Sequence, residues 1–169
     1  MFKIGEKIVY GQTGVCVVDD ICEKEILRKQ KKTYYVLKPV FQQNNVIYAP
    51  VDSDKVFMRR IITREQADKL ILQIPEIKKN LKSEAATPED YRSWLESHEC
   101  GDLIELTAKI YAKKEMAKEN KKKLGFLDEK YMKLAEDLLF GELSVALEIP
   151  FDEVPQYIKQ SLNKLQIEK

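Results

Sequence analysis

The chain has 169 residues, which allows one domain or two small ones, and 44% of them are hydrophobic, enough to build a core. Charged residues make up 34% but nearly cancel to a formal net charge of +1, which argues against a bulk polyanion binder of the histone type. No apolar run approaches the roughly 18 residues of a transmembrane helix, and the N-terminal segment MFKIGEKIVYG lacks the features of a signal peptide. The three cysteines, Cys16, Cys22 and Cys100, fit no common zinc spacing, so we expect free thiols in a reducing cytoplasm.

The N-terminal part of the chain has the pattern of a small β domain. Residues 1–60 carry 11 basic and 7 acidic side chains, whereas residues 61–169 carry 18 and 21. Apolar, β-branched and aromatic runs alternate with turn signals such as QTG and QQNN, and they predict five short strands, at 8–11, 15–21, 33–40, 46–50 and 56–62. A charged stretch, EKEILRKQKK, separates the second strand from the third. Turns at intervals of about 8–12 residues are typical of a small closed sheet of the Tudor or SH3 kind.

From Thr63 onward the pattern changes to helix. Thr63 and Gln66 form a capping box ahead of an apolar face, and Pro75 is expected to end this first helix. A polar loop over 82–87 precedes a second helix, with Thr87 as its N-cap. Three further helices are expected over 102–123, 128–147 and about 152–162.

The two halves together predict an α+β protein. Its N-terminal domain, residues 1–61, is expected to be a Tudor/SH3-like small β-barrel. Its C-terminal domain, residues 62–169, is expected to be all helical with about five helices, and Cys100-Gly101-Asp102 is expected to separate the second helix from the third.

Signals of enzymatic chemistry are weak. His98 is the single histidine, and it lies on the apolar stripe of a helix, which favours a structural or surface role. The sequence has no P-loop, no G-x-S-x-G and no G-x-G-x-x-G. The acidic pair Asp128-Glu129 is expected to be solvated at the start of a helix. We therefore expect no enzymatic activity, no metal, no cofactor and no small-molecule substrate.

Three features leave more than one interpretation open. The lysines near the end of the third helix suit either a solvated helix C-terminus or a surface that faces phosphates, and they are Lys113, Lys114, Lys118, Lys121, Lys122 and Lys123. Trp94 lies on a helix stripe, which favours core packing over a stacking or wedge role. The strand edge at 44–50 has apolar side chains suited to pairing with a strand of another protein, although Pro50 blunts one side of it.

Two ordered sets of residues point to a family. The first spans the β domain: Phe2-Lys3-Ile4-Gly5-Glu6, Ile8-Val9-Tyr10, Gly14, Tyr35-Val36-Leu37 and Ala49-Pro50. The second follows in the helical part: Cys100-Gly101-Asp102-Leu103, Leu124, Glu129-Lys130-Tyr131-Met132, Leu138-Leu139 and Glu142-Leu143. In order and spacing they resemble the CarD/CdnL family of bacterial transcription regulators, whose N-terminal module is shared with the transcription-repair coupling factor. The resemblance extends from about residue 2 to 155.

The resemblance implies a cytoplasmic transcription regulator with two macromolecular partners and no association with membranes. Its N-terminal domain would dock on the RNA polymerase β subunit by strand addition, through Lys24, Arg28, Val46 and Tyr48. Its helical domain would meet promoter DNA at the upstream edge of the melted bubble and stabilise the open complex, through Arg92, Lys113, Lys114, Lys121 and Lys130.

Some positions depart from the family pattern. The wedge tryptophan of the family falls at Thr87, not at Trp94, and the two arginines that usually follow it fall at Glu89 and Asp90. On the polymerase-facing strand, Tyr48 replaces a basic residue. The acidic substitutions support an alternative function, a polymerase-binding adaptor that does not contact DNA and recruits another protein through its helices.

Overall fold

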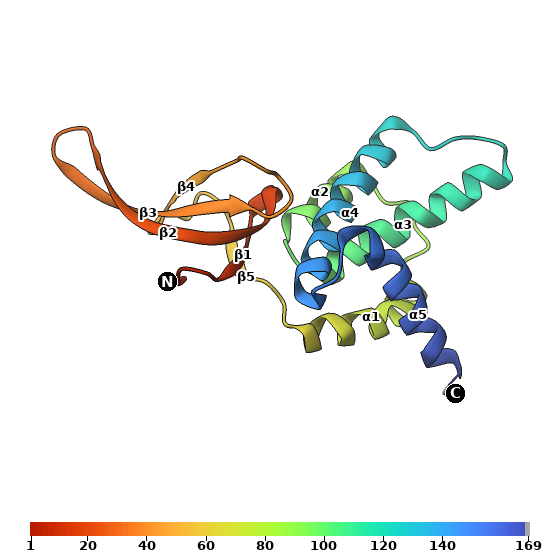
Figure 1. The fold of residues 1–169 in the computed structure, drawn as a ribbon. Coiled ribbons are helices and arrows are strands. Elements are labelled where there is room, and N and C mark those ends of the chain that lie inside the picture. Colours follow the sequence, from red (N-terminus) through yellow and green to blue (C-terminus); the bar gives the residue numbers. More distant parts are fainter. Residues whose placement is uncertain (168–169) are drawn as a thin grey trace. The chain divides into compact units, whose positions relative to one another are not determined.

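We describe residues 1–167 of the chain from a computed structural model (Figure 1). The chain forms two compact units, one from Met1 to Ile61 and one from Ile62 onward. Within residues 1–167 the first unit contains an antiparallel sheet of five strands and the second contains five α-helices, which confirms the predicted α+β class. No helix within these residues is long and apolar enough to cross a membrane.

The sheet of the first unit has a linear strand order, β4-β3-β2-β1-β5, and every neighbouring pair is antiparallel. Its strands are β1 (Lys7–Tyr10), β2 (Gly14–Ile26), β3 (Gln30–Pro39), β4 (Ile47–Pro50) and β5 (Met58–Arg60), with a 3₁₀ turn at Gly11–Thr13. β4 and β5 stand at the two ends of this order, and within the described residues no hydrogen-bonded ladder joins them to each other. Both strands therefore keep an edge on which another strand can pair.

The charged stretch between the second and third predicted strands is itself part of the sheet. β2 and β3 continue as a hairpin ribbon through this stretch, with Lys24 opposite Lys32 and Ile26 opposite Gln30 (Figure 1). Arg28 and its neighbour Lys29 turn the chain with left-handed φ angles of 70° and 64°. Such residues are uncommon at these angles because a Cβ atom crowds the carbonyl oxygen, so the turn was not evident from the sequence.

The core of the β unit is small and apolar. Its buried residues are Ile8, Cys16, Val18, Tyr35, Leu37 and Ala49. Phe2 covers one side, where its backbone N–H donates to the Tyr35 hydroxyl over 2.9 Å and the two rings lie 5.6 Å apart. Cys16 is fully buried, as its alternation with apolar neighbours predicts, and burial raises the pKa of its thiol to about 11.

The helices of the second unit are α1 (Arg64–Lys79), α2 (Pro88–Glu96), α3 (Cys100–Glu119), α4 (Phe126–Leu147) and α5 (Val154–Ile167), with a 3₁₀ turn at Phe151–Glu153. The prediction that Pro75 ends the first helix is wrong, because α1 continues for one more turn beyond it. An internal proline removes one backbone hydrogen bond and costs about 3 kcal/mol. Here Ile71 and Ile74 are buried in the core on the same helix, and Ile77 packs against that core beyond the proline. Tertiary packing thus holds the helix on both sides of Pro75.

The sequence predicts that the lysine-rich segment lies wholly within the third helix, but the helix ends before the last three lysines. Lys121 has a left-handed φ of 56°, the Lys122 N–H donates to the Ala117 carbonyl over 2.7 Å, and the Lys121 N–H donates to the Lys118 carbonyl over 3.1 Å. This pair of bonds is the Schellman arrangement that ends a helix. Lys121, Lys122 and Lys123 therefore stand in the loop between α3 and α4, and Gly125 is the N-cap of α4.

Candidate functional site

Tyr48 and Lys24, two of the predicted polymerase-binding residues, are in contact beside the edge strand β4. Tyr48 projects from β4 with 48% of its surface exposed, and Val46, 43% exposed, immediately precedes the strand. The Lys24 Nζ lies 3.3 Å from the centroid of the Tyr48 ring, although β3 separates the two strands that carry these residues. An exposed cation–π contact of this kind contributes about 0.5–1 kcal/mol. Arg28 stands apart from the pair, at the turn of the hairpin.

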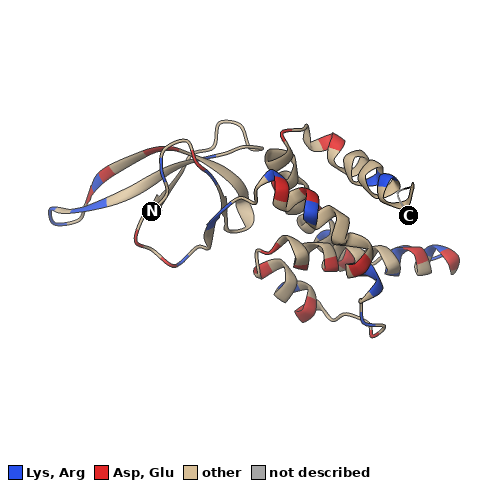
Figure 2. Cartoon of the chain, turned by 90° about the horizontal axis from the view of Figure 1, so that it is seen from below, with Lys and Arg blue, Asp and Glu red and all other residues tan. Residues whose placement is uncertain are grey.

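Basic side chains are prominent along this hairpin. Figure 2 shows Lys and Arg in blue on both arms and at the turn, next to a few acidic residues. The turn also carries Leu27, whose side chain is 88% exposed. The β unit therefore presents a cationic ribbon beside an edge strand with apolar side chains.

Three elements of the helical unit meet at a buried carboxylate, Asp128. The Tyr91 hydroxyl of α2 donates to Asp128 Oδ1 over 2.8 Å, and the Lys113 Nζ of α3 lies 2.8 Å from Asp128 Oδ2. Asp128 is 6% exposed, so its predicted place as a solvated helix-start residue is wrong. Burial, together with the hydrogen bond and charge of Asp128, raises the pKa of Tyr91 well above its ordinary value, so the phenol keeps its proton.

This network changes the role of Lys113. The sequence places Lys113 among the lysines that face DNA, but its ammonium group is already paired with Asp128. Nothing in the local sequence indicates this pairing, because the three residues come from three different helices and meet only in the tertiary structure.

We expect Asp128→Ala to lower the free energy of unfolding by about 1–3 kcal/mol, because it leaves the buried Tyr91 hydroxyl without its acceptor. The ion pair adds little to this value because 58% of the Lys113 side chain is exposed and screened by water. Urea unfolding of the whole chain measures the change. The matched control is Asp137→Ala, which removes an exposed i,i+4 partner of Lys133 and is expected to cost at most about 0.5 kcal/mol. Equal losses for the two variants would contradict a structural role for the Asp128 network.

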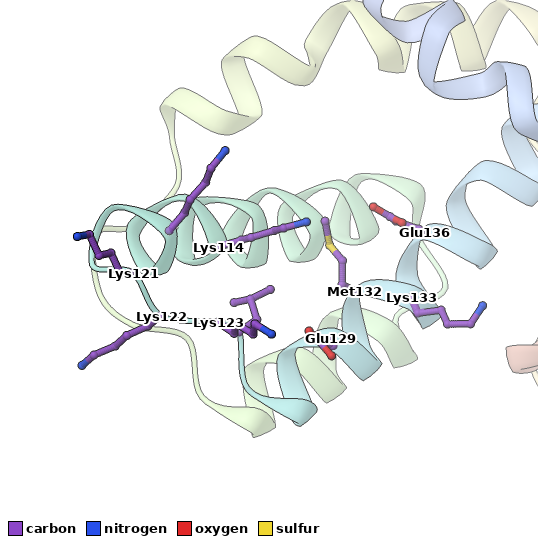
Figure 3. Close-up of a pocket in the computed structure, with 10 residues that line it drawn as sticks. Lys114, Lys121, Lys122, Lys123, Glu129, Met132, Lys133 and Glu136 are labelled. Carbon is purple, nitrogen blue, oxygen red and sulfur yellow. The ribbon is translucent and has the colours of Figure 1, made fainter.

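A pocket of about 550 Å³ lies between the end of α3 and the start of α4 (Figure 3). Its lining contains six lysines, two glutamates and two apolar residues: Lys114, Lys118, Lys121, Lys122, Lys123, Lys133, Glu129, Glu136, Leu124 and Met132. We call this the lysine pocket. Elsewhere in the helical unit, acidic and basic residues are interspersed along the helices (Figure 2). Cations therefore predominate in the lining of this pocket, and such an accumulation attracts polyanions.

One carboxylate in the lysine pocket is partly desolvated. Burial and the neighbouring Asp137 raise the pKa of Glu136, and Lys114 and Lys133 oppose this shift. The pocket thus combines cations with a less exposed wall formed by Glu136, Met132 and Leu124. Of the predicted DNA-binding residues, Lys114 and Lys121 line it.

Arg92 and Lys130, the two remaining predicted DNA-binding residues, are exposed, and each is the chain neighbour of a tyrosine at the contact between α2 and α4. Arg92 follows Tyr91 in α2, and Lys130 precedes Tyr131 in α4. The rings of Tyr91 and Tyr131 lie 5.5 Å apart. Since each cation adjoins one of these two rings in the chain, both belong to the region where α2 meets α4.

The residues at the start of α2 serve the helix itself. Thr87 is the N-cap, as predicted: its hydroxyl accepts from the Asp90 N–H over 3.2 Å, and Asp90 accepts from the Thr87 N–H over 2.8 Å. This backbone hydrogen bond lowers the pKa of Asp90, with smaller contributions from Lys82 and Lys109. Trp94, partly buried, packs against the core with its ring 6.5 Å from that of Tyr91, in agreement with the core role favoured by its stripe position.

The described residues contain no group of three or more histidine, cysteine, aspartate or glutamate side chains placed to hold a metal ion. Two surfaces stand out among residues 1–167, the β4 edge and the lysine pocket. Both are suited to macromolecular partners.

Comparison with known proteins assigns the β unit. Residues 2–62 match the family model described as the CarD-like/TRCF RID domain. No curated protein matches the chain. The matched residues span the whole five-stranded sheet. The N-terminal unit therefore belongs to the CarD-like/TRCF RID domain family, and this match supports an RNA polymerase-interacting role connected with transcription.

Proposed function

We propose that the chain binds the β subunit of RNA polymerase through the edge of β4 and stabilises the open promoter complex through its helical unit. The observation that carries the proposal is the contact between Lys24 and Tyr48 on an edge strand of a CarD-like/TRCF RID domain. Tyr48 thus lies on an edge strand that can still accept a partner, and Lys24 reaches it from β2.

Strand addition suits this edge for three reasons. β4 pairs on one side only, with β3, so its other side offers backbone donors and acceptors. Tyr48 and Val46 expose apolar surface next to these groups. Lys24, held over the Tyr48 ring, supplies a positive charge at the position where the family pattern has a basic residue. A partner surface with acidic groups and a free strand would match all three features.

The helical unit supplies the proposed contact with DNA. Arg92 and Lys130 flank the α2–α4 contact, and the lysine pocket presents further cations between α3 and α4. Cations on this scale bind phosphates without reading sequence. Tethering to polymerase raises the local concentration of such a weak contact, and preferential binding to melted DNA shifts the promoter toward the open state by the difference in affinity.

The two halves of the proposal have separate tests. For the first, the isolated β lobe of RNA polymerase is expected to retain the whole chain in a pull-down, and absence of binding contradicts the docking half. For the second, forked promoter DNA is expected to bind with an affinity that falls as salt rises, because counterions are released.

The adaptor alternative has one observation in its favour. Glu89 and Asp90 are both exposed at the first turn of α2, two residues or more before Arg92, and their charge repels phosphates. An adaptor binds the β lobe but gives no salt-dependent shift with forked DNA. The pair of experiments therefore separates the two functions.

A further inference from the structure

One aromatic side chain of the helical unit has no place in the core. Phe126 is the first residue of α4, and 83% of its surface is exposed. Its neighbour Leu127 is 39% exposed. Tyr111 of α3 is also exposed, at 50%, but Phe126 is more exposed and has an exposed apolar neighbour, and large apolar groups exposed side by side indicate a contact surface.

Cations surround Phe126 along the chain. Lys121, Lys122 and Lys123 precede it by three to five residues, within the loop that leads into α4. Lys130 and Lys133 follow it at i+4 and i+7, a spacing that places all three on one face of the helix, and both lysines are exposed. Glu129 adds one negative charge at i+3. Residues 121–133 thus contain five lysines and two acids, and one of these acids, Asp128, is buried and paired with Lys113.

The base of this surface is fixed. Asp128, two residues beyond Phe126, is buried and bound to Tyr91 of α2 and to Lys113 of α3. The first turn of α4 also closes normally, with the Glu129 N–H donating to the Gly125 carbonyl over 3.1 Å. The backbone that carries Phe126 is therefore held by three helices, while the ring itself projects into solvent.

A flat apolar ring between phosphate-binding groups matches one class of partner, single-stranded nucleic acid. Unpaired bases expose π faces that stack on aromatic side chains, and the phosphates between them bind lysine. In a duplex the bases already stack on each other, so few base faces remain free for an aromatic side chain to stack on. We propose that Phe126 stacks on an unpaired base of single-stranded DNA, with the lysines of the loop and Lys130 on the adjoining phosphates. The inference rests on the proposed DNA contact and names the form of DNA that it prefers.

The test compares a short labelled thymidine oligonucleotide with a duplex of equal length, by fluorescence anisotropy on the whole chain. Phe126→Ala is expected to weaken binding of the single strand at least tenfold and to change binding of the duplex by less than about twofold. The Phe126→Trp variant is expected to retain binding, and stacking on the oligonucleotide is expected to quench the fluorescence of the introduced indole ring. Leu72→Ala, which removes another exposed apolar side chain, on α1, is the control and is expected to bind like the unchanged chain.

The outcomes separate this inference from the proposed function. If Lys130→Glu weakens both forms of DNA and Phe126→Ala weakens neither, the DNA contact stands and stacking by Phe126 is overturned. If the unchanged chain binds neither form, both are overturned. Binding to phosphatidylserine-containing vesicles that depends on Phe126, without binding to the single strand, also overturns the proposal, because an exposed aromatic residue among lysines suits anionic lipid as well.

Discussion

Replacing Tyr48 with glutamate is expected to weaken binding of the chain to the isolated β lobe of RNA polymerase by at least about tenfold. Tyr48 is half exposed on the free side of the sheet, and it supports the Lys24 ammonium at 3.3 Å. Glutamate removes the apolar ring, ends the cation–π contact and neutralises the local positive charge. A loss of about 1.4 kcal/mol of binding free energy corresponds to the expected tenfold change.

Surface plasmon resonance with the immobilised β lobe measures this effect. Lys24→Glu is expected to act in the same direction, and the double variant is expected to lose less than the sum because the two side chains share one contact. Lys7→Glu is the control, since it reverses an exposed charge on β1, which β2 and β3 separate from β4. Binding by the Tyr48 variant equal to that of the control would remove the β4 edge from the interface.

Reversing both charges at the α2–α4 contact, with Arg92→Glu and Lys130→Glu, is expected to shorten the lifetime of the open promoter complex by about tenfold or more. Each exposed cation is proposed to neutralise a phosphate, so each substitution replaces attraction with repulsion. The slope of log affinity against log salt is expected to decrease by about 2, one for each lost phosphate contact.

The lifetime is measured by challenging preformed open complexes with a competitor and following their decay. Lys69→Glu is the control, because it reverses an exposed charge on α1, away from the α2–α4 contact. Polymerase binding should be unchanged in the double variant, since the β4 edge lies in the other unit. Unchanged lifetimes together with normal docking would favour the adaptor function.

Local features of the fold could be predicted from the sequence. The capping box of Thr63 with Gln66 forms, and Thr87 is the N-cap of α2, where its hydroxyl accepts from the Asp90 N–H. Their partners are three residues apart, so the hydrogen bonds depend only on the chain entering a helix. The burial of Cys16 could be predicted for a similar reason, because alternation in a strand decides which side chains face the core. The family resemblance likewise depends on residues read in order along the chain.

Contacts between distant residues were decided only by the tertiary structure. Asp128 binds Tyr91 across 37 positions of sequence, and this pairing converts an expected solvated carboxylate into the junction of three helices. Lys24 and Tyr48 meet although β3 lies between their strands, and Pro75 stays helical because residues on both sides of it pack into the core. Periodicity records which face of an element is apolar, whereas the partner of a charged or polar side chain depends on which other element packs beside it. For that reason the sequence indicated the two units and their elements. Only the structure showed that Lys113 is paired with Asp128 and that the ring of Phe126 is exposed.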